Sequence, residues 1–404
     1  MSEHRYKVLV LASTFPRWTG DHQPAFVFEL CRRLAAARDV TVLAPGAPGA
    51  AGEEVIEGIR VRRYRYAPAA LQSLAYGGGL LANLRSEPWR ALLVPGFLAA
   101  QWRALVRVLR SESWDVLHAH WTLPQGIVGA SAMAFHRGRK PRLIITAHGS
   151  DVLRLRGWFW DALNRHALSA ADAVTVVGPE LEDRVLGLGV PREHLCHLPM
   201  GVDVANRFLP GTPHESPGAR ILFVGRLVPE KGADLAIRAL PAVLESYPDA
   251  QLEIVGDGPE RGRLENSAKL LNVSARVSFV GALPADALPP KYRAATLCVV
   301  PSRSEGFGLV AIEAMACGCP VVVSDLPSLK KTAMDGDAAV VVPSENAMAL
   351  AVAIVRLLDD RPRMALLATR GRIRAESYAW NATANGYAEL IDRLAGEHSE
   401  RTDG

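Results

Sequence analysis

Cysteine is scarce in this chain of 404 residues, which contains only five. Their odd number, their scatter and their apolar neighbours argue against a disulfide framework and indicate the reduced thiols of a cytoplasmic protein: Cys31, Cys196, Cys298, Cys317 and Cys319. Cys317 and Cys319 lack a second pair of ligands, so we do not interpret the Cys-Gly-Cys sequence as a metal site.

A strong net charge is also absent. The chain carries +4 overall, with 22% charged and 49% hydrophobic residues, which is typical of a soluble globular enzyme and not of a disordered or nucleic-acid-coating chain. Residues 1–200 hold 24 Lys and Arg against 17 Asp and Glu, whereas residues 201–404 hold 22 against 25. The basic first half is compatible with anionic lipid or a phosphorylated acceptor, although an arginine-rich solvated surface is the commoner cause.

No long apolar run is present. The uncharged run at residues 66–84 is interrupted by Pro68, Gln72 and glycines, and is too broken for a membrane span. The first five residues are followed only by the short apolar run 6–12, so we expect no signal peptide. These features predict a cytoplasmic protein. Peripheral contact with the inner face of the cell membrane is compatible with this prediction.

Apolar strands alternate with helices throughout, which predicts parallel, doubly wound α/β sheets. We expect strands at 6–13, 39–44, 59–66, 115–120, 142–148 and 173–178, and again at 221–225, 251–256, 276–281, 297–301, 320–325 and 338–343. Pro and Gly accumulate between the two sets. The predicted domains are therefore 1–198 and 219–377, with a linker at 199–218. A last helix, 378–394, is expected to pack on the first domain and to end in a frayed tail.

Two stretches combine aromatic and basic residues. Residues 67–113 are predicted to be helical and irregular, and residues 153–160 read Leu-Arg-Leu-Arg-Gly-Trp-Phe-Trp. A surface that contacts lipid or a polyprenyl acceptor and a helix that packs on the sheet are both compatible with each stretch. We favour packing for both.

The sequence around residues 301–318 is predicted to form a strand, a turn and a helix. Glu305 and Glu313 lie eight positions apart, and at 3.6 residues per turn this spacing would bring both toward one cleft at the carboxyl edge of the sheet. Free N–H groups at the helix start suit an anionic ligand, and the carboxylates suit hydroxyls. A nucleotide-sugar has both parts. The alternative is a solvated loop carboxylate and a surface helix residue.

Three further side chains follow strands directly. Arg226 and Lys231 follow the strand at 221–225, and two cations there suit a diphosphate leaving group, with a salt-bridged surface turn as the alternative. His148 lies at the carboxyl end of the strand at 142–148, which makes it a candidate for the transfer site, although a lone histidine is more often structural. His120 is a weaker candidate of the same kind.

These residues belong to a wider set of motifs. These motifs are Gly225-Arg226, Lys231-Gly232, Gly256-Asp-Gly-Pro259, Ser304-Glu305-Gly-Phe-Gly through Gly318 and His148-Gly-Ser-Asp151. Together they resemble those of the retaining GT-B glycosyltransferases of glycosyltransferase family 4. The resemblance covers nearly the whole chain and is most specific over 220–345. It implies two Rossmann-like domains that face a central cleft.

The resemblance also implies roles for individual residues. Arg226 and Lys231 would bind the donor diphosphate, Glu305 would lie by the donor sugar, and Glu313 would hold the ribose hydroxyls. His148 would lie at the transfer point. Backbone groups would complete the substrate site at Gly306, Phe307, Gly308 and Leu309, with Val280 near the base. His148 and Glu305 are thus the catalytic candidates, and no cofactor is implied.

The sequence departs from the family pattern in two places. Many members carry Gly-Gly in the first loop, where it meets the phosphates, whereas this chain has Gly20-Asp21, so Gly20 matches only the first glycine of that pair. Asp335-Gly-Asp337 spells the Asp-x-Asp of metal-dependent transferases, but it precedes a strand where the family has a turn. We therefore expect no metal site there.

The predicted function is transfer of a hexose, with retention, from a UDP- or GDP-sugar to the hydroxyl of a lipid-linked or cell-surface glycan acceptor. Front-face displacement, in which the departing diphosphate takes the acceptor proton, is favoured over Glu305 as a nucleophile. A sugar-nucleotide 2-epimerase of the same architecture and a nucleotide-sugar-binding protein without turnover remain alternatives. A nicotinamide-dependent oxidoreductase is disfavoured because the glycines at 256–262 miss the required spacing. Nucleic acid is not expected as a partner.

Overall fold

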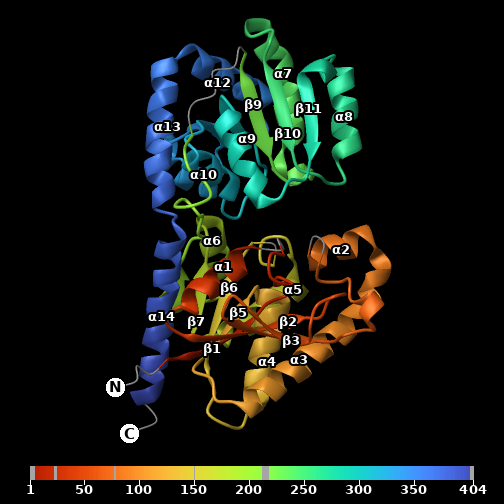
Figure 1. The fold of residues 1–404 in the computed structure, drawn as a ribbon, viewed down its shortest axis with the longest axis vertical. Helices are drawn as coiled ribbons and strands as arrows, with labels where there is room; N and C mark the ends of the chain where they lie inside the picture. The colour runs from red at the N-terminus through yellow and green to blue at the C-terminus, as the bar shows by residue number, and fades with distance from the viewer. Residues whose placement is uncertain (1–4, 22–24, 77–78, 150, 212–217, 401–404) are drawn as a thin grey trace. The chain divides into compact units, whose positions relative to one another are not determined.

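A computed structural model describes residues 5–21, 25–76, 79–149, 151–211 and 218–400 (Figure 1). The chain forms two compact units. The N-terminal unit contains Met1–Pro199 together with Thr383–Gly404, and the C-terminal unit contains Met200–Ala382.

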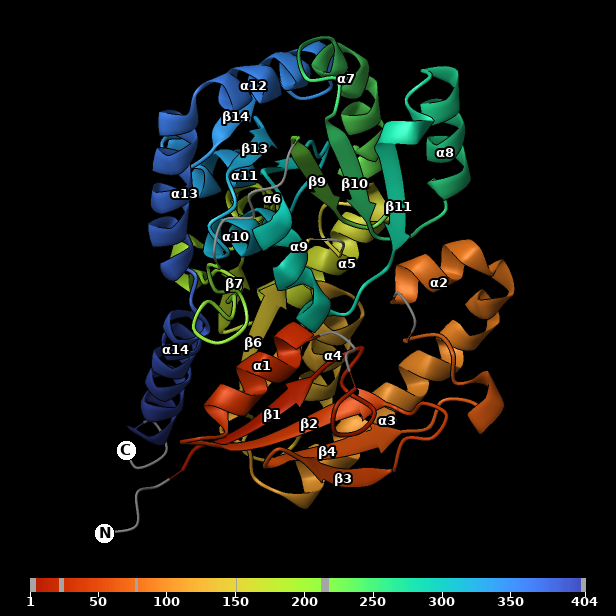
Figure 2. The same ribbon diagram turned by 45° about the horizontal axis from the view of Figure 1, so that its top comes forward.

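The N-terminal unit is built on an eight-stranded sheet in the order β3-β4-β2-β1-β5-β6-β7-β8 (Figure 2). Its neighbouring strands are parallel except for β3 and β4, which form a hairpin. The strands are β1 (Lys7–Leu11), β2 (Asp39–Pro45), β3 (Glu53–Ile56), β4 (Ile59–Tyr64), β5 (Val116–His120), β6 (Arg142–Ala147), β7 (Ala173–Val176) and β8 (Leu195–His197). The central strands are continuously buried because helices cover both faces, which explains their unbroken apolar runs.

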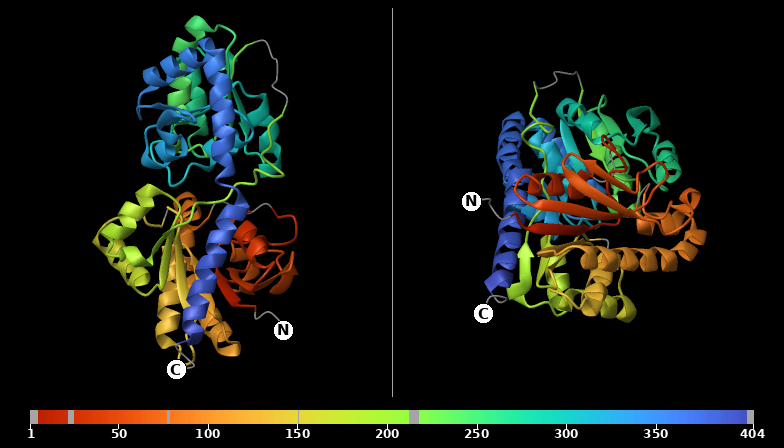
Figure 3. Two further views of the ribbon diagram at one scale, coloured as in Figure 1. Left: turned by 90° about the vertical axis from the view of Figure 1, so that its left-hand side faces the viewer. Right: turned by 60° about the horizontal axis from the view of Figure 1, so that its bottom comes forward.

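The helices of this unit agree with the predicted alternation. They are α1 (Ala25–Leu34), α2 (Leu80–Ser86), α3 (Val94–Ser111), α4 (Ile127–Phe135), α5 (Trp158–Ser169) and α6 (Pro179–Gly187), with short helices η1 (Ala69–Leu71), η2 (Pro88–Leu93), η3 (Thr122–Gly126) and η4 (Arg192–His194). The last helix, α14 (Trp380–Glu400), is longer than predicted. Its Tyr387 hydroxyl lies 3.2 Å from Thr146 Oγ1 and 3.1 Å from Thr175 Oγ1, which fixes α14 on β6 and β7 (Figure 3).

The two aromatic and basic stretches have different outcomes. In α3, Phe97 and Leu105 are buried, so the packing interpretation is confirmed for this helix, whereas Trp89 and Leu92 in η2 are 47% and 83% exposed. By length and apolar composition alone, the helical segment Pro88–Ser111 would suffice to cross a membrane, but core helices pass the same test. At the start of α5 the packing interpretation is wrong. Trp158, Phe159 and Trp160 are 84%, 50% and 38% exposed, because the inner face of α5 is filled by other residues.

The C-terminal unit is built on a six-stranded parallel sheet in the order β11-β10-β9-β12-β13-β14 (Figure 1). The strands are β9 (Arg220–Val224), β10 (Gln251–Val255), β11 (Val277–Gly281), β12 (Leu297–Val300), β13 (Val321–Ser324) and β14 (Val340–Val342). Strand order reverses between β9 and β12. At such a reversal the loops after two adjacent strands diverge, and in open α/β sheets this is where ligands bind.

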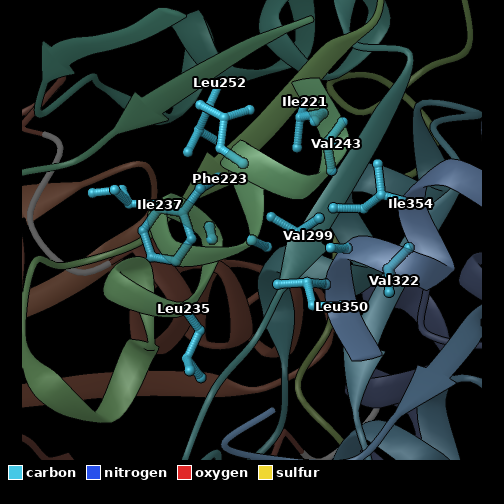
Figure 4. Packing of buried hydrophobic residues seen from close by; sticks show 14 of the residues in the cluster. Ile221, Phe223, Leu235, Ile237, Val243, Leu252, Val299, Val322, Leu350 and Ile354 are labelled. Carbon is cyan, nitrogen blue, oxygen red and sulfur yellow. The ribbon is translucent and has the colours of Figure 1, made fainter. Parts of the chain in front are cut away.

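Helices cover both faces of this second sheet. They are α7 (Ala233–Ser246), α8 (Arg261–Leu270), α9 (Leu288–Ala294), α10 (Leu309–Ala316), α11 (Pro327–Thr332), α12 (Ala347–Asp359) and α13 (Arg361–Glu376), with short helices η5 (Pro229–Lys231), η6 (Ser274–Arg276), η7 (Ala285–Ala287) and η8 (Met334–Gly336). Phe223, Ile237, Val299, Leu350 and Ile354 meet in one buried cluster between the sheet and the helices α7 and α12 (Figure 4). Burial of each such side chain contributes about 1.5–3 kcal/mol, and this core holds the strand ends in place.

Candidate functional site

The strand-order reversal of the C-terminal sheet brings Lys231 and Glu305 together. Lys231 ends η5 after β9, and Glu305 lies in the loop after β12. The Lys231 ammonium nitrogen lies 2.6 Å from Glu305 Oε2, and the Ser302 hydroxyl lies 3.3 Å from the same oxygen. The predicted cation and the predicted carboxylate are therefore one half-buried, charge-assisted pair.

A glycine allows these two loops to approach. Gly232 has φ +70°, and a Cβ there would lie 2.0 Å from the carbonyl oxygen of Pro301. The same approach is held by Arg303, whose backbone N–H donates to the Glu230 carbonyl at 2.8 Å. Only glycine satisfies both the backbone angle and the contact. Gly232 thus fixes the place of Lys231 beside Glu305.

Arg303 is a residue that the sequence analysis missed. Its guanidinium donates to both carboxylate oxygens of Asp234, at 2.7 and 2.8 Å, and to Glu345 at 2.6 Å. The hydrogen bond to Asp234 is the main reason that the pKa of Arg303 is raised. Asp234 lies 69 positions earlier in the chain, so no local spacing could have indicated this pair. It holds the loop of Glu305 on the start of α7.

The turn into α10 depends on Gly308. This residue has φ +90°, and a Cβ there would lie 2.7 Å from Leu329 Cδ2. The helix begins only at Leu309, so Glu305 is not helical and the predicted 3.6-residue relation between Glu305 and Glu313 is wrong. Gly306 is half-buried, and the buried Phe307 ring packs edge-on against Tyr378 at 5.5 Å. The Ser328 hydroxyl donates to the Glu305 carbonyl at 2.8 Å, which completes the anchoring of this loop.

Glu313 belongs to a separate hydrogen-bonded pair. The Tyr292 hydroxyl, from α9, donates to Glu313 Oε2 at 2.8 Å. Burial raises the pKa of Glu313 to about 7, while the Tyr292 hydrogen bond opposes that rise. Tyr292 was not found from the sequence, because the pair joins two helices. The pair presents a carboxyl group that titrates near neutral pH.

The other predicted residues of this unit lie at the ends of strands. Arg226 is exposed two residues after β9, and Val280 is 38% exposed near the end of β11. The glycines at 256 and 258 have a packing role: a Cβ on Gly258 would lie 2.4 Å from the Leu227 carbonyl. They let the loop after β10 touch the loop that carries Arg226.

In the N-terminal unit, His148 lies against a second histidine. His148 Nε2 is 3.0 Å from His120 Nδ1, and the two rings are stacked with centroids 5.2 Å apart. The His118 ring is tilted against the His120 ring with centroids 4.2 Å apart, and its Nε2 lies 2.7 Å from Thr146 Oγ1. A hydrogen-bonded chain therefore joins His118, Thr146 and Tyr387 on α14, and the histidine pair meets this chain through the contact between the His120 and His118 rings.

Burial keeps these rings neutral. It lowers the pKa of His148 and of His118 to about 3, and it also lowers the pKa of His120 well below its usual range. Phe26 and Trp121 pack against His148 with ring centroids at 4.8 and 4.9 Å. A neutral imidazole pair shares one proton between Nε2 of His148 and Nδ1 of His120, so the tautomer of one ring determines that of the other.

The backbone around His148 is held by Asp151. Its carboxylate accepts the N–H of Thr122 at 2.7 Å and that of Gly149 at 3.0 Å. Burial raises the pKa of Asp151, while these N–H groups oppose that rise. Asp151 thus ties the loop after β6 to the loop after β5, which positions the histidine pair.

Gly20 lies in an exposed turn with φ +83°, and no atom lies within 4 Å of a Cβ built there. The neighbouring Asp21 is engaged with Arg17, which donates to its two oxygens at 2.8 and 3.0 Å. The Arg17 guanidinium also lies 4.4 Å from the Trp18 ring centroid. The turn is therefore closed by an ion pair at the position where the family pattern has a second glycine.

Comparisons with known proteins agree with this geometry. The family description "Glycosyltransferase Family 4" matches residues 24–206, and "Glycosyl transferases group 1" matches residues 209–374. The chain belongs to glycosyltransferase family 4. The glycogen synthase of Mycobacterium tuberculosis is 30% identical over 98% of this chain and 96% of its own length.

Two more relatives of this glycosyltransferase are similar over shorter spans. The D-inositol 3-phosphate glycosyltransferase of Acidothermus cellulolyticus is 35% identical over 78% of this chain and 76% of that protein. The GDP-mannose-dependent alpha-(1-6)-phosphatidylinositol monomannoside mannosyltransferase of Mycolicibacterium smegmatis is 33% identical over 66% of this chain and 74% of that protein.

Solved structures identify the fold. Sucrose-phosphate synthase from Thermosynechococcus elongatus has a TM-score of 0.79 at 26% identity and covers 97% of this chain and 100% of its own. Anabaena HepE in complex with UDP has a TM-score of 0.73 at 18% identity and covers 96% of this chain and 100% of its own. The glycosyltransferase therefore has the GT-B fold, as its resemblance implied.

The two carboxylates of the Asp-x-Asp sequence, Asp335 and Asp337, do not cluster with other side chains into a metal-binding group, among the residues that the structure describes. Asp337 is paired with Arg370, and Asp335 is 80% exposed at its side chain. Within the described ranges, His, Cys, Asp and Glu form no group of three or more that could hold a metal ion.

Proposed function

We propose that this glycosyltransferase moves a hexose, with retention and without a metal ion, from a UDP- or GDP-sugar to a hydroxyl acceptor. The acceptor is a lipid-linked or cell-surface glycan precursor, and the protein works in the cytoplasm with peripheral contact at the inner membrane face. The contact between Lys231 and Glu305, 2.6 Å long, is the observation that carries the proposal.

Lys231 and Glu305 are suited to bind the two groups joined by the bond that breaks in the donor, the diphosphate and the hexose. Lysine has three donor hydrogens, so Lys231 can keep Glu305 and also reach a diphosphate oxygen. Glu305, held by Lys231 and Ser302, then accepts hydroxyls of the hexose. The N–H groups of Gly306 to Leu309 at the start of α10 add partial positive charge on the phosphate side.

Cationic side chains supply the charge that a metal ion would otherwise provide. Arg226 is exposed after β9, in the same loop as Lys231. Charge develops on the diphosphate as the glycosidic bond breaks, so fixed cations stabilise the transition state more than the ground state. Glu313, oriented by Tyr292, accepts the ribose hydroxyls, and the backbone near Val280 contacts the base.

Retention follows from attack on the face that the diphosphate leaves. The acceptor oxygen approaches C1 beside the breaking bond, its proton passes to a diphosphate oxygen, and the new bond forms as the old one breaks. Glu305 is a poor nucleophile in this arrangement because Lys231 and Ser302 occupy one of its oxygens. His148, neutral and held by His120, positions the hexose at the transfer point.

The names of relatives support the donor and acceptor classes. One similar enzyme is named for GDP-mannose and a phosphatidylinositol mannoside, another for inositol phosphate, and HepE was solved with UDP. A nucleotide-diphosphate sugar and an acceptor linked to lipid or phosphate agree with the basic first half of the chain.

Thermal unfolding with UDP-, GDP- and ADP-sugars tests the proposal. A donor at about 100 times its Kd adds about 2.7 kcal/mol to the free energy of unfolding. We expect a UDP- or GDP-sugar to protect, and Lys231→Ala to abolish the protection. Turnover with that donor in a mixed-acceptor screen must survive a chelator and yield the retained anomer. Stabilisation by none of the three donors, or complete loss of turnover with chelator, would refute the proposal.

A further inference from the structure

We propose that the aromatic turn of α5, formed by Trp158, Phe159 and Trp160, docks on the surface of an anionic lipid bilayer. This turn would be the surface by which the protein contacts the membrane. Lipid binding by the turn does not depend on the proposed function, whereas the delivery of a lipid-linked acceptor rests on it. The helix α5 belongs to the N-terminal unit and is labelled in Figure 2.

The aromatic turn concentrates exposed apolar surface at one place. Trp158 is 84%, Phe159 50% and Trp160 38% exposed. Consecutive rings pack edge-on, with centroids 5.9 and 5.2 Å apart, so the three form one cluster. Other highly exposed apolar side chains, such as Leu270 at 84%, do not form such a run of three aromatic residues.

The aromatic turn cannot fold inward, because the opposite face of α5 is already buried. Asn164, Ala167 and Leu168 are buried, and α5 packs against α4 and η3. Rotating the helix to hide the aromatic rings would expose these residues. The rings are therefore presented outward by a helix with a fixed orientation.

The charges around the aromatic turn are complementary to anionic lipid. Arg156 precedes it and Arg165 follows two turns later, and both are exposed. The one acidic residue in the first turn, Asp161, is hydrogen-bonded to Arg184 and is thereby neutralised. Indole rings favour the boundary between headgroups and acyl chains, and arginines add attraction to anionic headgroups. Aromatic rings flanked by arginines suit that boundary.

Docking here would also bring lipid toward the histidine pair. Trp158 lies ten positions after His148, and α5 packs against η3, which directly follows Trp121. Trp121 contacts the His148 ring at 4.9 Å between centroids. An acceptor anchored in the bilayer would thus present its hydroxyl to the same edge of the sheet without leaving the membrane.

Sedimentation with lipid vesicles tests the proposal, without donor or acceptor. The full chain is mixed with vesicles of phosphatidylcholine alone, or of equal molar parts of phosphatidylcholine and phosphatidylglycerol. We expect binding to the anionic vesicles and much weaker binding to the neutral ones. About 0.5 M salt should weaken it, because the Debye length falls to a few ångströms.

Two variants separate the aromatic and the charge contributions. Trp158→Ala with Phe159→Ala should weaken binding to anionic vesicles at least about tenfold. Arg156→Gln with Arg165→Gln should weaken it about fivefold for each charge removed. Leu270→Ala, which removes an equally exposed apolar side chain from the other unit, is the matched control and should bind as the wild type does.

Protection against thermal unfolding by a nucleotide-sugar is measured on every variant. It reports folding and donor binding independently of lipid, and we expect it to be unchanged. The docking proposal is overturned if the wild type does not sediment with anionic vesicles, or if the aromatic variant binds them as tightly as Leu270→Ala does. Loss of donor protection in the wild type would instead count against the proposed function alone.

Discussion

The loops at the edge of the C-terminal sheet carry paired charges, whereas the corresponding edge of the N-terminal sheet carries neutral rings. In the first, Lys231 is paired with Glu305 and Arg303 with Asp234. In the second, His120 and His148 share one proton in a buried stack. A charged edge suits a diphosphate, and a neutral edge suits the hydroxyls of sugars.

The two edges also respond to pH in opposite directions. Burial lowers the pKa of His148 and His118 to about 3, so the unfolded chain binds protons that the folded unit does not. The N-terminal unit therefore loses stability as the pH falls below about 6.5. Glu313 has a pKa raised to about 7, so it favours folding at low pH and that contribution is lost as the pH rises toward 7.

The largest expected effect comes from removing the charged edge. Lys231→Ala should lower kcat/KM at least about a hundredfold, since under the proposed function it removes a cation from the leaving group, and it leaves Glu305 without its ion-pair partner. Lys291→Ala is a matched control, because Lys291 also makes a 2.6 Å ion pair, with Glu253. Steady-state kinetics on both variants measures the difference. An equal loss of activity in the two would mean that the pair at Glu305 has no special role.

A smaller effect is expected from the neutral edge. His120→Ala should lower kcat about tenfold to a hundredfold, because His148 loses the partner that orients it, while the Kd of the donor stays unchanged. His120→Asn should recover most of the activity, since its amide can reach the place of Nδ1. Single-turnover rates and donor titrations separate the two quantities. If both variants lose donor affinity in parallel, His120 is only a structural residue.

The strands were predictable because their signal is local. Each strand predicted in the two halves is present with ends within two residues, since both sheets are covered on both faces and require continuous apolar runs. The strands β3 and β8 were missed. Glu53 in β3 is exposed at a sheet edge, and β8 has only three residues, so neither produces such a run.

The contacts at the site were less predictable. Lys231 and Glu305 meet across 74 positions, and the family motif indicated both residues without giving their contact. Three other contacts depend on the packing of elements that are distant in the sequence. They join Arg303 to Asp234, Tyr292 to Glu313, and His120 to His148. The helical spacing of the two glutamates failed because it was counted across the turn at Gly308, where the backbone is not helical. The aromatic turn of α5 was misassigned because periodicity alone does not say which face of a helix is covered.

The pH contrast can be tested through Glu313. Glu313→Gln replaces the carboxyl group with a neutral one, so it should raise the unfolding free energy of the unliganded protein above pH 7, by at most about 3 kcal/mol. Near pH 4 the variant and the wild type should be nearly alike, since Glu313 is then protonated in the folded protein and mostly protonated in the unfolded chain, where its pKa is about 4.5. Thermal unfolding at several pH values measures the gain. A gain that is equal at pH 4 and pH 8 would contradict the raised pKa.

The smallest expected effect concerns the turn at Gly20. Asp21→Gly restores the glycine pair of the family pattern and removes the carboxylate that accepts hydrogen bonds from the Arg17 guanidinium at 2.8 and 3.0 Å and from the Arg17 backbone N–H at 2.8 Å. If this turn meets the donor phosphates, loss of the carboxylate should tighten donor binding by about threefold or less, because partly exposed ion pairs are worth little. Asp335→Gly, at a solvent-exposed carboxylate of the other unit, controls for the change in net charge. Equal donor affinities in the two variants would show that the turn at Gly20 does not contact the donor. The proposed diphosphate site would then consist only of residues at the charged edge of the C-terminal sheet.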